Sequence, residues 1–333
     1  MSSRVAVLGA GSWGTALAMQ LARLNHEVSL WARDAEQAGQ MQRQRLNRRY
    51  LPEFPLASNI TVTADLDAAL ANAQRFLIVT PSHAFPETLK QIQPYVSEDS
   101  GLAWATKGFE PGSGRLLHEV VEEHLGSDMP LALVTGPSFA RDVAAGLPTA
   151  VTVAASTPDF GATWAALLHG SGFRAYYTAD LVGAELGGAI KNVLAVACGM
   201  ADGMSLGANT RAALITRGLA ETMRLGKALK ADPRTLMGLA GIGDLVLTCT
   251  GDLSRNRRLG LALGRGQTIE QAVAEIGQVV EGIKTAEETM RLAERMGVEM
   301  PITEQVHGIL FKGWSARTGV TKLMERDIKR ETE

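Results

Sequence analysis

The hydrophobic residues in the first half of the chain fall into short runs that alternate with longer stretches of mixed polarity. Short apolar runs are typical of buried strands, whereas apolar positions that recur every three or four residues are typical of helices. The predicted strands are 5–8, 28–31, 60–62, 76–79, 102–105, 131–134, 151–154 and 173–177. The predicted helices between them are 15–24, 68–73, 116–125 and 160–168, together with a helical, arginine-rich stretch between the strands 28–31 and 60–62. This alternation predicts βαβ units and a parallel sheet.

After Thr178 the pattern changes, because the strand-like runs stop and only helical periods remain. The predicted helices in this second half are 181–200, 210–229, 233–239, 257–263, 269–276, 284–296 and 302–311. We therefore predict an α/β domain over residues 1–180 and an all-α domain over residues 181–333. We expect the two domains to pack together with a ligand in the cleft between them.

Length and charge limit the class of protein. A chain of 333 residues is longer than one hydrophobic core usually supports, which agrees with two domains. Hydrophobic residues make up 46% of the chain and charged residues 20%, a balance that favours a folded globular protein. The formal net charge of -2 provides no field that would attract nucleic acid or an anionic membrane surface, so neither is expected as a partner.

The cysteines and the apolar segments indicate where the protein works. Cys198 and Cys249 show no metal-ligand spacing with the six histidines, so we expect no metal site and free thiols in a reducing cytoplasm, although a single disulfide stays open. Glycines interrupt the first apolar run before it reaches the length of a signal peptide. The most apolar stretch, 181–200, contains Glu185 and Lys191, so no membrane span is expected.

A glycine-rich loop, Gly9-Ala10-Gly11-Ser12-Trp13-Gly14, lies between the first predicted strand and the first predicted helix. This is the context of a dinucleotide-binding fingerprint: Gly9 permits the tight turn, Gly11 lets a pyrophosphate approach the backbone, and Gly14 lets helix and strand pack closely. The diphosphate would lie at the N-terminus of the helix, where backbone N–H groups point outward. The alternative is a glycine-rich turn without a ligand.

The end of the second predicted strand bears on the choice of cofactor. A carboxylate that binds the adenosine ribose usually stands here, but this chain has Arg33 followed by Asp34. Arg33 can pair with a 2′-phosphate, and Asp34 can still accept a hydrogen bond from a ribose hydroxyl. The sequence therefore favours NADP and leaves NAD possible; the alternative for Arg33 is a solvated loop side chain.

Ligands of parallel sheets bind outside the carboxyl ends of the strands, and three loops of this chain are expected there: 80–82, 106–108 and 136–140. Lys107 is the only charged residue in these loops. A cation at this edge can bind an anionic substrate or polarise a carbonyl group. The alternative is a lysine that caps a strand in solvent.

Lys191 and Asn192 lie in the middle of the predicted helix 181–200, which is apolar on nearly every face. Burial disfavours the charged ammonium form of a lysine, and this is how a lysine becomes able to act as a general base. The alternative is a structural ion pair with Glu185 or another carboxylate.

A third polar cluster joins Gly241-Ile242-Gly243-Asp244 to Ser254-Arg255-Asn256. Glycines and an arginine at a helix N-terminus are typical of an anion site. Arg255 could hold a phosphate bidentately while Asp244 accepts a hydrogen bond from a hydroxyl, which favours a phosphorylated polyol as ligand. The alternative is an ordinary helix cap with a solvated arginine.

Taken together, these motifs and their order resemble the bacterial-type NAD(P)-dependent glycerol-3-phosphate dehydrogenase family. The resemblance covers nearly the whole chain. The order of these motifs along the chain is far more specific evidence than the glycine loop alone. The motifs that carry it are 9–17, 79–82, 107–108, 136–140, 185–192, 241–245 and 254–256.

The resemblance implies a Rossmann-type dinucleotide-binding domain followed by an all-α C-terminal domain. It implies reversible hydride transfer between NAD(P)H and C2 of the substrate pair dihydroxyacetone phosphate and sn-glycerol 3-phosphate, which supplies membrane phospholipid synthesis. A homodimer is a possible assembly. The implied cofactor contacts are Gly9, Gly11, Ser12, Trp13, Gly14, Arg33, Lys107, Ala140, Arg255, Val279 and Glu281. The implied substrate contacts are Lys107, Gly136, Ser138, Lys191, Asp244, Ser254, Arg255 and Asn256, with Lys191 as the proton acceptor.

Two other classes remain open. A β-hydroxyacid or 6-phosphogluconate type dehydrogenase has the same architecture and also places a lysine and an asparagine on a helix between its domains. The anion site predicted at Arg255 favours a small phosphorylated substrate over a hydroxy acid. A protein that only senses NADPH would keep the glycine loop but would have no use for a buried lysine at position 191.

Overall fold

The computed structural model describes residues 2–328, 330 and 331. The chain divides into two compact units. Unit 1 comprises Met1–Pro111, Arg115–Gly188 and Ala231–Asp244, and unit 2 comprises Gly112–Gly114, Ala189–Lys230 and Leu245–Glu333. Both units are therefore assembled from separate pieces of the chain, whereas the sequence predicts one boundary, after residue 180.

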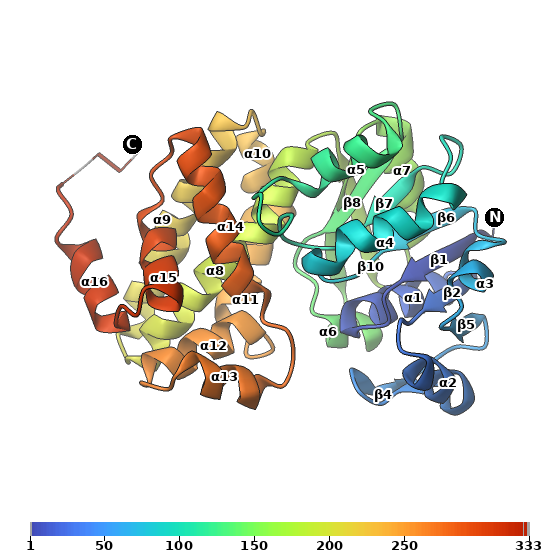
Figure 1. Ribbon diagram of the computed structural model, residues 1–333, viewed down its shortest axis with the longest axis horizontal. Helices are drawn as coiled ribbons and strands as arrows, with labels where there is room; N and C mark the ends of the chain where they lie inside the picture. The colour runs from blue at the N-terminus through green and yellow to red at the C-terminus, as the bar shows by residue number, and fades with distance from the viewer. Residues whose placement is uncertain (1, 329, 332–333) are drawn as a thin grey trace. The chain divides into compact units, whose positions relative to one another are not determined.

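Unit 1 is built on an eight-stranded sheet with the order β10-β9-β8-β7-β6-β1-β2-β5 (Figure 1). The predicted fold class is confirmed: an α/β unit with a largely parallel sheet, together with a helical unit. The strands are β1 (Arg4–Leu8), β2 (Glu27–Trp31), β5 (Ile60–Thr63), β6 (Arg75–Ile78), β7 (Leu102–Trp104), β8 (Leu131–Thr135), β9 (Thr149–Ala155) and β10 (Phe173–Thr178). Each of them overlaps a predicted strand.

One strand direction differs from the prediction. The sheet is parallel except that β8 and β9 pair antiparallel, with Leu133 opposite Ala154. A parallel return needs a crossover that carries the chain back across the sheet, usually as a long helix. The connection between these strands contains only the short helix α6 (Ala140–Ala144), so β9 returns against β8. β9 and β10 are parallel to each other, with α7 (Pro158–Leu168) between them.

Helices bury both faces of the sheet, and successive side chains of each strand point to opposite faces. Val5 and Val7 belong to the core that includes α1 (Ser12–Arg23), α6 and α7. Ala6 and Leu8 belong to the opposite core, which includes α3 (Leu66–Leu70), α4 (Phe85–Ile92) and α5 (Leu117–Leu125). The strands are therefore near-continuous apolar runs, which is why the sequence pattern finds them.

Several elements of unit 1 are absent from the sequence prediction. They are the helices α4 and α6, the short 3-10 helices 82–84 and 93–95, and a hairpin of β3 (Leu46–Asn47) and β4 (Leu51–Pro55), whereas the helical stretch predicted after β2 is present as α2 (Ala35–Gln44). Prolines account for part of this. Pro52 and Pro55 stand in β4, where a proline argues against a strand.

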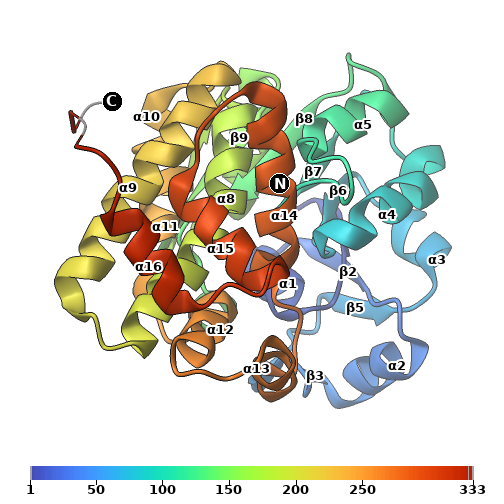
Figure 2. The same cartoon turned by 60° about the vertical axis from the view of Figure 1, so that its left-hand side comes forward.

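The helices of unit 2 pack on one another, with α14 against α15, α12 against α13, and α15 against both α9 and α16 (Figure 2). The α-helices after β10 are α8 (Leu181–Gly203), α9 (Gly207–Ala228), α10 (Pro233–Leu236), α11 (Asp244–Thr250), α12 (Arg255–Gly264), α13 (Ile269–Ile276), α14 (Glu281–Met296), α15 (Pro301–Phe311) and α16 (Ala316–Met324), and the π-helix Leu239–Gly243 precedes α11. The prediction lacks α11 and α16. In α16 only Gly319 is buried, so no apolar stripe reveals the helix.

Glycines let α8 and α12 approach with their backbones in contact. A Cβ atom on Gly199 would overlap the carbonyl oxygen of Arg257, and one on Gly260 would overlap that of Val196. Within the described part of the chain, α8 is also the one unbroken helix long and apolar enough to cross a membrane, and 89% of its apolar stretch is buried in the protein. A segment that joins 233–250 to 255–264 passes the same test only if its 48° bend is ignored.

Candidate functional site

The glycine loop of unit 1 has no room for a side chain at Gly9 and Gly14, whereas the space beside Gly11 is open. Gly9 has φ +123°, and a Cβ atom there would lie 2.7 Å from the carbonyl oxygen of Val79. A Cβ atom on Gly14 would overlap the carbonyl oxygen of Gly9. No atom lies within 4 Å of the corresponding position on Gly11, so a ligand can approach the backbone there.

The N-terminus of α1 adjoins this open position. Gly11 is the N-cap residue and contributes no side-chain cap, and the first turn contains no acidic residue. The backbone N–H groups of Ser12 and its neighbours are therefore suited to an anion. The indole N–H of Trp13 is buried and has no hydrogen-bond partner among the described residues. These features fit a dinucleotide diphosphate.

Arg33 and Asp34 follow β2, and both side chains are exposed. Asp34 caps α2, because its carboxylate accepts hydrogen bonds from the backbone N–H groups of Glu36 (2.9 Å) and Gln37 (3.1 Å). The carboxylate expected near the ribose thus has a structural role already. Arg33 is an exposed cationic residue at the strand end where an adenosine ribose would bind.

Lys107 and Asp244, singled out separately by the sequence, form one ion pair in unit 1. Lys107 Nζ lies 2.7 Å from Asp244 Oδ2, and the two side chains are 14% and 1% exposed. Lys107 Nζ also donates to the carbonyl oxygen of Gly136 (3.3 Å), which accepts a second hydrogen bond from Ser138 Oγ (2.9 Å). An ammonium group has three donors, so a third remains for a ligand at the carboxyl ends of β7 and β8.

Lys191 is 9% exposed, as the apolar surroundings predict. Its Nζ donates a 3.1 Å hydrogen bond to Thr248 Oγ1 in unit 2. Thr248 is not among the site residues predicted from the sequence. The available signal was its place four residues after Asp244, since residues with this spacing share one face of a helix, but α11 itself was not predicted.

Glu185, the alternative partner considered for Lys191, forms its ion pair with His118. His118 Nδ1 lies 2.5 Å from Glu185 Oε2, and the backbone N–H of His118 donates to Glu185 Oε1 (3.0 Å). Burial alone would lower the pKa of His118, but its hydrogen bond to Glu185 and the negative charge of that carboxylate outweigh this and raise the pKa.

Asn256 and Ser254 already have structural partners in unit 2. Asn256 Nδ2 donates to Asn192 Oδ1 (2.8 Å), and Asn256 Oδ1 accepts from the backbone N–H of Gly282 (2.9 Å). This chain of bonds ties α8, α12 and α14 together. Ser254 is the N-cap residue of α12, where its hydroxyl oxygen accepts from the backbone N–H of Arg257. Each side chain still has one hydrogen that it can donate to a ligand.

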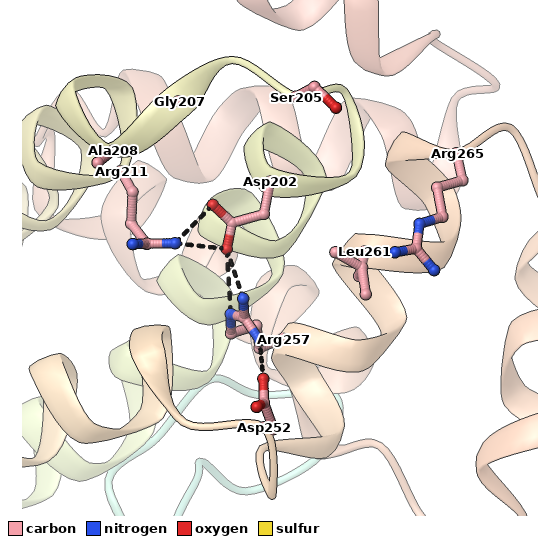
Figure 3. Close-up of a pocket in the computed structure, with 9 residues that line it drawn as sticks. All are labelled: Asp202, Ser205, Gly207, Ala208, Arg211, Asp252, Arg257, Leu261 and Arg265. Carbon is pink, nitrogen blue, oxygen red and sulfur yellow. Dashed lines mark hydrogen bonds and ion pairs between the residues drawn. The ribbon is translucent and has the colours of Figure 1, made fainter.

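Two arginines in the first turns of α12 have different environments. Arg255 is exposed, and no ion pair or hydrogen bond of its guanidinium occurs within the described residues. Arg257 lies between two carboxylates at a pocket of unit 2 (Figure 3), with Asp202 Oδ2 and Asp252 Oδ1 each at 2.7 Å. Arg257 is therefore fixed within the protein, whereas Arg255 can bind a ligand.

The remaining predicted cofactor residues lie at or shortly before the first residue of a helix. Ala140 is the first residue of α6 in unit 1. In unit 2, Val279 is 48% exposed and Glu281 is the first residue of α14. Across the described part of the chain, histidine, cysteine, aspartate and glutamate nowhere form a group of three or more that could hold a metal ion.

Comparison with known families covers nearly the whole chain. Residues 4–161 match the family described as NAD-dependent glycerol-3-phosphate dehydrogenase N-terminus, and residues 180–321 match the corresponding C-terminus. The chain is 58% identical to glycerol-3-phosphate dehydrogenase [NAD(P)+] of Stenotrophomonas maltophilia, over 99% of this chain and 97% of that protein. It is 57% identical to the same-named protein of Xanthomonas euvesicatoria, over 98% and 96% of the two chains.

Solved structures agree with this similarity. The crystal structure of glycerol-3-phosphate dehydrogenase from Coxiella burnetii superposes with a TM-score of 0.94 at 46% identity, covering 98% of this chain and 99% of that chain. A ketopantoate reductase from Ralstonia eutropha superposes with a TM-score of 0.61 at 16% identity, covering 97% and 100% of the two chains, which is a likeness of fold alone. The resemblance predicted from the sequence motifs is thereby confirmed.

Proposed function

The chain belongs to the NAD-dependent glycerol-3-phosphate dehydrogenase family, and from this we propose that it reduces dihydroxyacetone phosphate to sn-glycerol 3-phosphate in a reversible reaction. In this proposal the product supplies membrane phospholipid synthesis, and the enzyme works in the cytoplasm. Free thiols at Cys198 and Cys249 support a reducing compartment. We also propose a homodimer, for which the exposed Met324 and Ile328 offer apolar surface.

The cofactor is NAD(P)H, and we propose that NADPH is preferred. Arg33 supports this preference, because a guanidinium beside the adenosine ribose can pair with a 2′-phosphate. The nicotinamide ring, when bound, supplies the hydride for the carbonyl carbon. The residues proposed to hold the cofactor are Gly9, Gly11, Ser12, Trp13, Gly14, Arg33, Lys107, Ala140, Arg255, Val279 and Glu281.

Arg255 and Lys107 are proposed to bind the charged and polar parts of the substrate. Arg255 is an exposed guanidinium in the first turn of α12, where the helix dipole also favours a phosphate. Lys107, held by Asp244, has one donor left for a substrate oxygen. Gly136, Ser138, Ser254 and Asn256 complete the proposed substrate contacts.

Lys191 is proposed as the group that moves the proton. Its ammonium form donates a proton to the alkoxide that develops at C2 during reduction, and its neutral form accepts the proton in the reverse direction. The hydrogen bond to Thr248 holds Nζ in one position. The side chain therefore loses less conformational entropy when it takes part in the reaction. This buried lysine, on a helix that belongs to the matched family region, is the observation that carries the proposal.

The proposal is tested by following NADPH absorbance with purified protein and dihydroxyacetone phosphate. We expect oxidation of NADPH that depends on both the protein and the substrate. The controls are a panel of 2- and 3-hydroxy acids and 6-phosphogluconate, assayed in the oxidative direction beside glycerol 3-phosphate. A higher kcat/KM with any of these than with glycerol 3-phosphate would contradict the proposed substrate, and absence of turnover with all of them would contradict an enzyme.

A further inference from the structure

A buried hydroxyl group beside the glycine loop lacks a hydrogen-bond partner. Thr80 follows the end of β6 and is 8% exposed, and its Oγ1 is inaccessible and unpaired among the described residues. Buried polar atoms are nearly always hydrogen-bonded, because leaving one unpaired costs free energy. An exception in a native structure therefore calls for an explanation, and a ligand that supplies the missing partner is one.

The backbone of Thr80 is fixed on both sides. Its carbonyl oxygen accepts a 2.7 Å hydrogen bond from Thr106 Oγ1, which follows the neighbouring strand β7. Its backbone nitrogen lies 3.2 Å from the position that a Cβ atom of Gly9 would occupy. The backbone of Thr80 thus lies next to the glycine loop.

Among the other unpaired polar atoms of unit 1, the indole N–H of Trp13 belongs to the glycine loop itself, and three more lie in different surroundings. The indole groups of Trp104 and Trp164 are fully buried and pack edge-on against Phe85 and Phe160 inside the two cores. Thr135 Oγ1 lies beneath Gly188, 3.0 Å from where a Cβ atom of that glycine would be. Outside the glycine loop itself, only Thr80 among these groups adjoins the loop proposed to bind the diphosphate.

The strand order indicates which part of the cofactor reaches Thr80. β1 lies between β2 and β6, so the chain turns to opposite sides of the sheet at this point. In such sheets one mononucleotide half of the cofactor lies on each side. Arg33, after β2, is on the adenosine side, and Thr80, after β6, is on the nicotinamide side.

We infer that Thr80 Oγ1 forms a hydrogen bond with the nicotinamide-riboside half of the bound cofactor. This inference rests on the proposed function. A threonine hydroxyl can both donate and accept, so it can pair with the ribose hydroxyls of that half. Thr80 would then be a cofactor ligand in addition to the residues implied by the family motifs.

The decisive variant is Thr80→Val, which keeps the branched shape and removes only the hydroxyl. In the free protein the change removes an unpaired polar group, so the melting temperature should stay the same or rise. In the complex it removes a hydrogen bond, so the Kd for NADH should rise about five- to fifteen-fold. The Thr80→Ser variant restores a hydroxyl and should bind NADH more tightly than Thr80→Val.

Two controls separate this role from a structural one. Thr106→Val removes a hydroxyl that is bonded to the Thr80 carbonyl, so its melting temperature should fall, opposite to Thr80→Val. ADP contains the adenosine half and the diphosphate without the nicotinamide riboside. Its Kd should be the same for wild type and Thr80→Val.

Titration of each protein with NADH and with ADP decides the matter. A loss of affinity confined to NADH supports the inference. An unchanged Kd for NADH, or equal losses for NADH and ADP, would overturn it while leaving the proposed function intact. A wild-type protein that binds neither NADH nor NADPH would overturn the proposed function and this inference with it.

Discussion

Lys191 is a charged residue in apolar surroundings, and its replacement tests the proposed chemistry most directly. Lys191→Met keeps most of the side-chain volume and removes Nζ, so kcat should fall by at least ~100-fold while NADPH binding and folding are retained. The matched control is Lys227→Met, because Lys227 is an exposed lysine of α9. Its kcat should stay close to that of wild type.

A structural role for Lys191 predicts a different result. If the lysine served to neutralise a buried carboxylate, its loss would leave that charge unpaired and lower the melting temperature, with activity falling only in proportion. Measuring kcat, NADPH affinity and thermal unfolding on one preparation distinguishes the two roles. A stable variant with near-normal turnover would contradict the proton-transfer role.

Arg33 determines cofactor preference in our proposal. Arg33→Ala should weaken NADPH binding by roughly 1–3 kcal/mol and leave NADH binding nearly unchanged, because only NADPH carries the 2′-phosphate. The Kd values of both cofactors check this, with Arg48→Ala as the control because Arg48 is also exposed. Equal losses for both cofactors would show that Arg33 does not distinguish them.

At the scale of secondary-structure elements, Glu221 of α9 caps the start of α15. Its carboxylate accepts hydrogen bonds from the backbone N–H groups of Ile302 (2.6 Å) and Thr303 (3.3 Å), and from the hydroxyl of Thr303. Glu221 is only 3% exposed. Burial outweighs these bonds and raises its pKa from the ordinary value of 4.5 to about 7.

This raised pKa makes stability depend on pH. The folded protein binds the Glu221 proton more tightly than the unfolded chain does, so this contribution is fully present below pH 4.5 and is lost as pH rises through 7. The loss amounts to about 3 kcal/mol if the whole shift is realised. Glu221→Gln cannot titrate, so its free energy of unfolding should show a smaller decline across this range.

Denaturant unfolding at several pH values between 5 and 8 checks this prediction. The exposed Glu304 of α15 provides the control, because Glu304→Gln should leave the pH dependence of wild type unchanged. If the unfolding curves of wild type and Glu221→Gln shift with pH in parallel, the carboxyl group of Glu221 does not titrate in this range.

At the scale of the whole molecule, the sequence predicts elements better than their connections. Each strand of the main sheet is an apolar run, and a run of this kind can be recognised locally. The direction of β9 depends on the path between strands, and the place of 231–244 in unit 1 depends on contacts distant in sequence. Neither has a local signal.

The candidate site shows the same limit. Motifs single out Lys107 and Asp244 as individual residues, but their ion pair joins positions 137 residues apart, which no local pattern encodes. Thr248 is a common residue type in a helix that the pattern does not reveal. The roles of Ser254 and Asn256 as a helix cap and an interhelix link also emerge only when the helices are in place.

The antiparallel pairing of β9 determines where α8 begins. Thr178, the last residue of β10, pairs with Ala154 of β9, and Ala154 pairs with Leu133 of β8. The end of β10 therefore lies beside the middle of β8. α8 starts soon afterwards and reaches Thr135, the last residue of β8, with its glycine pair. A Cβ atom on Gly187 would overlap the carbonyl oxygen of Ala240, and one on Gly188 would crowd Thr135.

The segment from Thr178 to this glycine pair therefore has little tolerance for a change in length. One inserted or deleted residue would rotate the helix by about 100° relative to the sheet, or force the helix to shift along its axis. If the helix stays in place, an inserted residue would move Leu186 into the position of Gly187, against Ala240. A deleted residue would move Ala189 into the position of Gly188, against Thr135. Natural length variation should thus accumulate in surface loops such as the exposed turn 126–128 and be absent between β10 and Gly188.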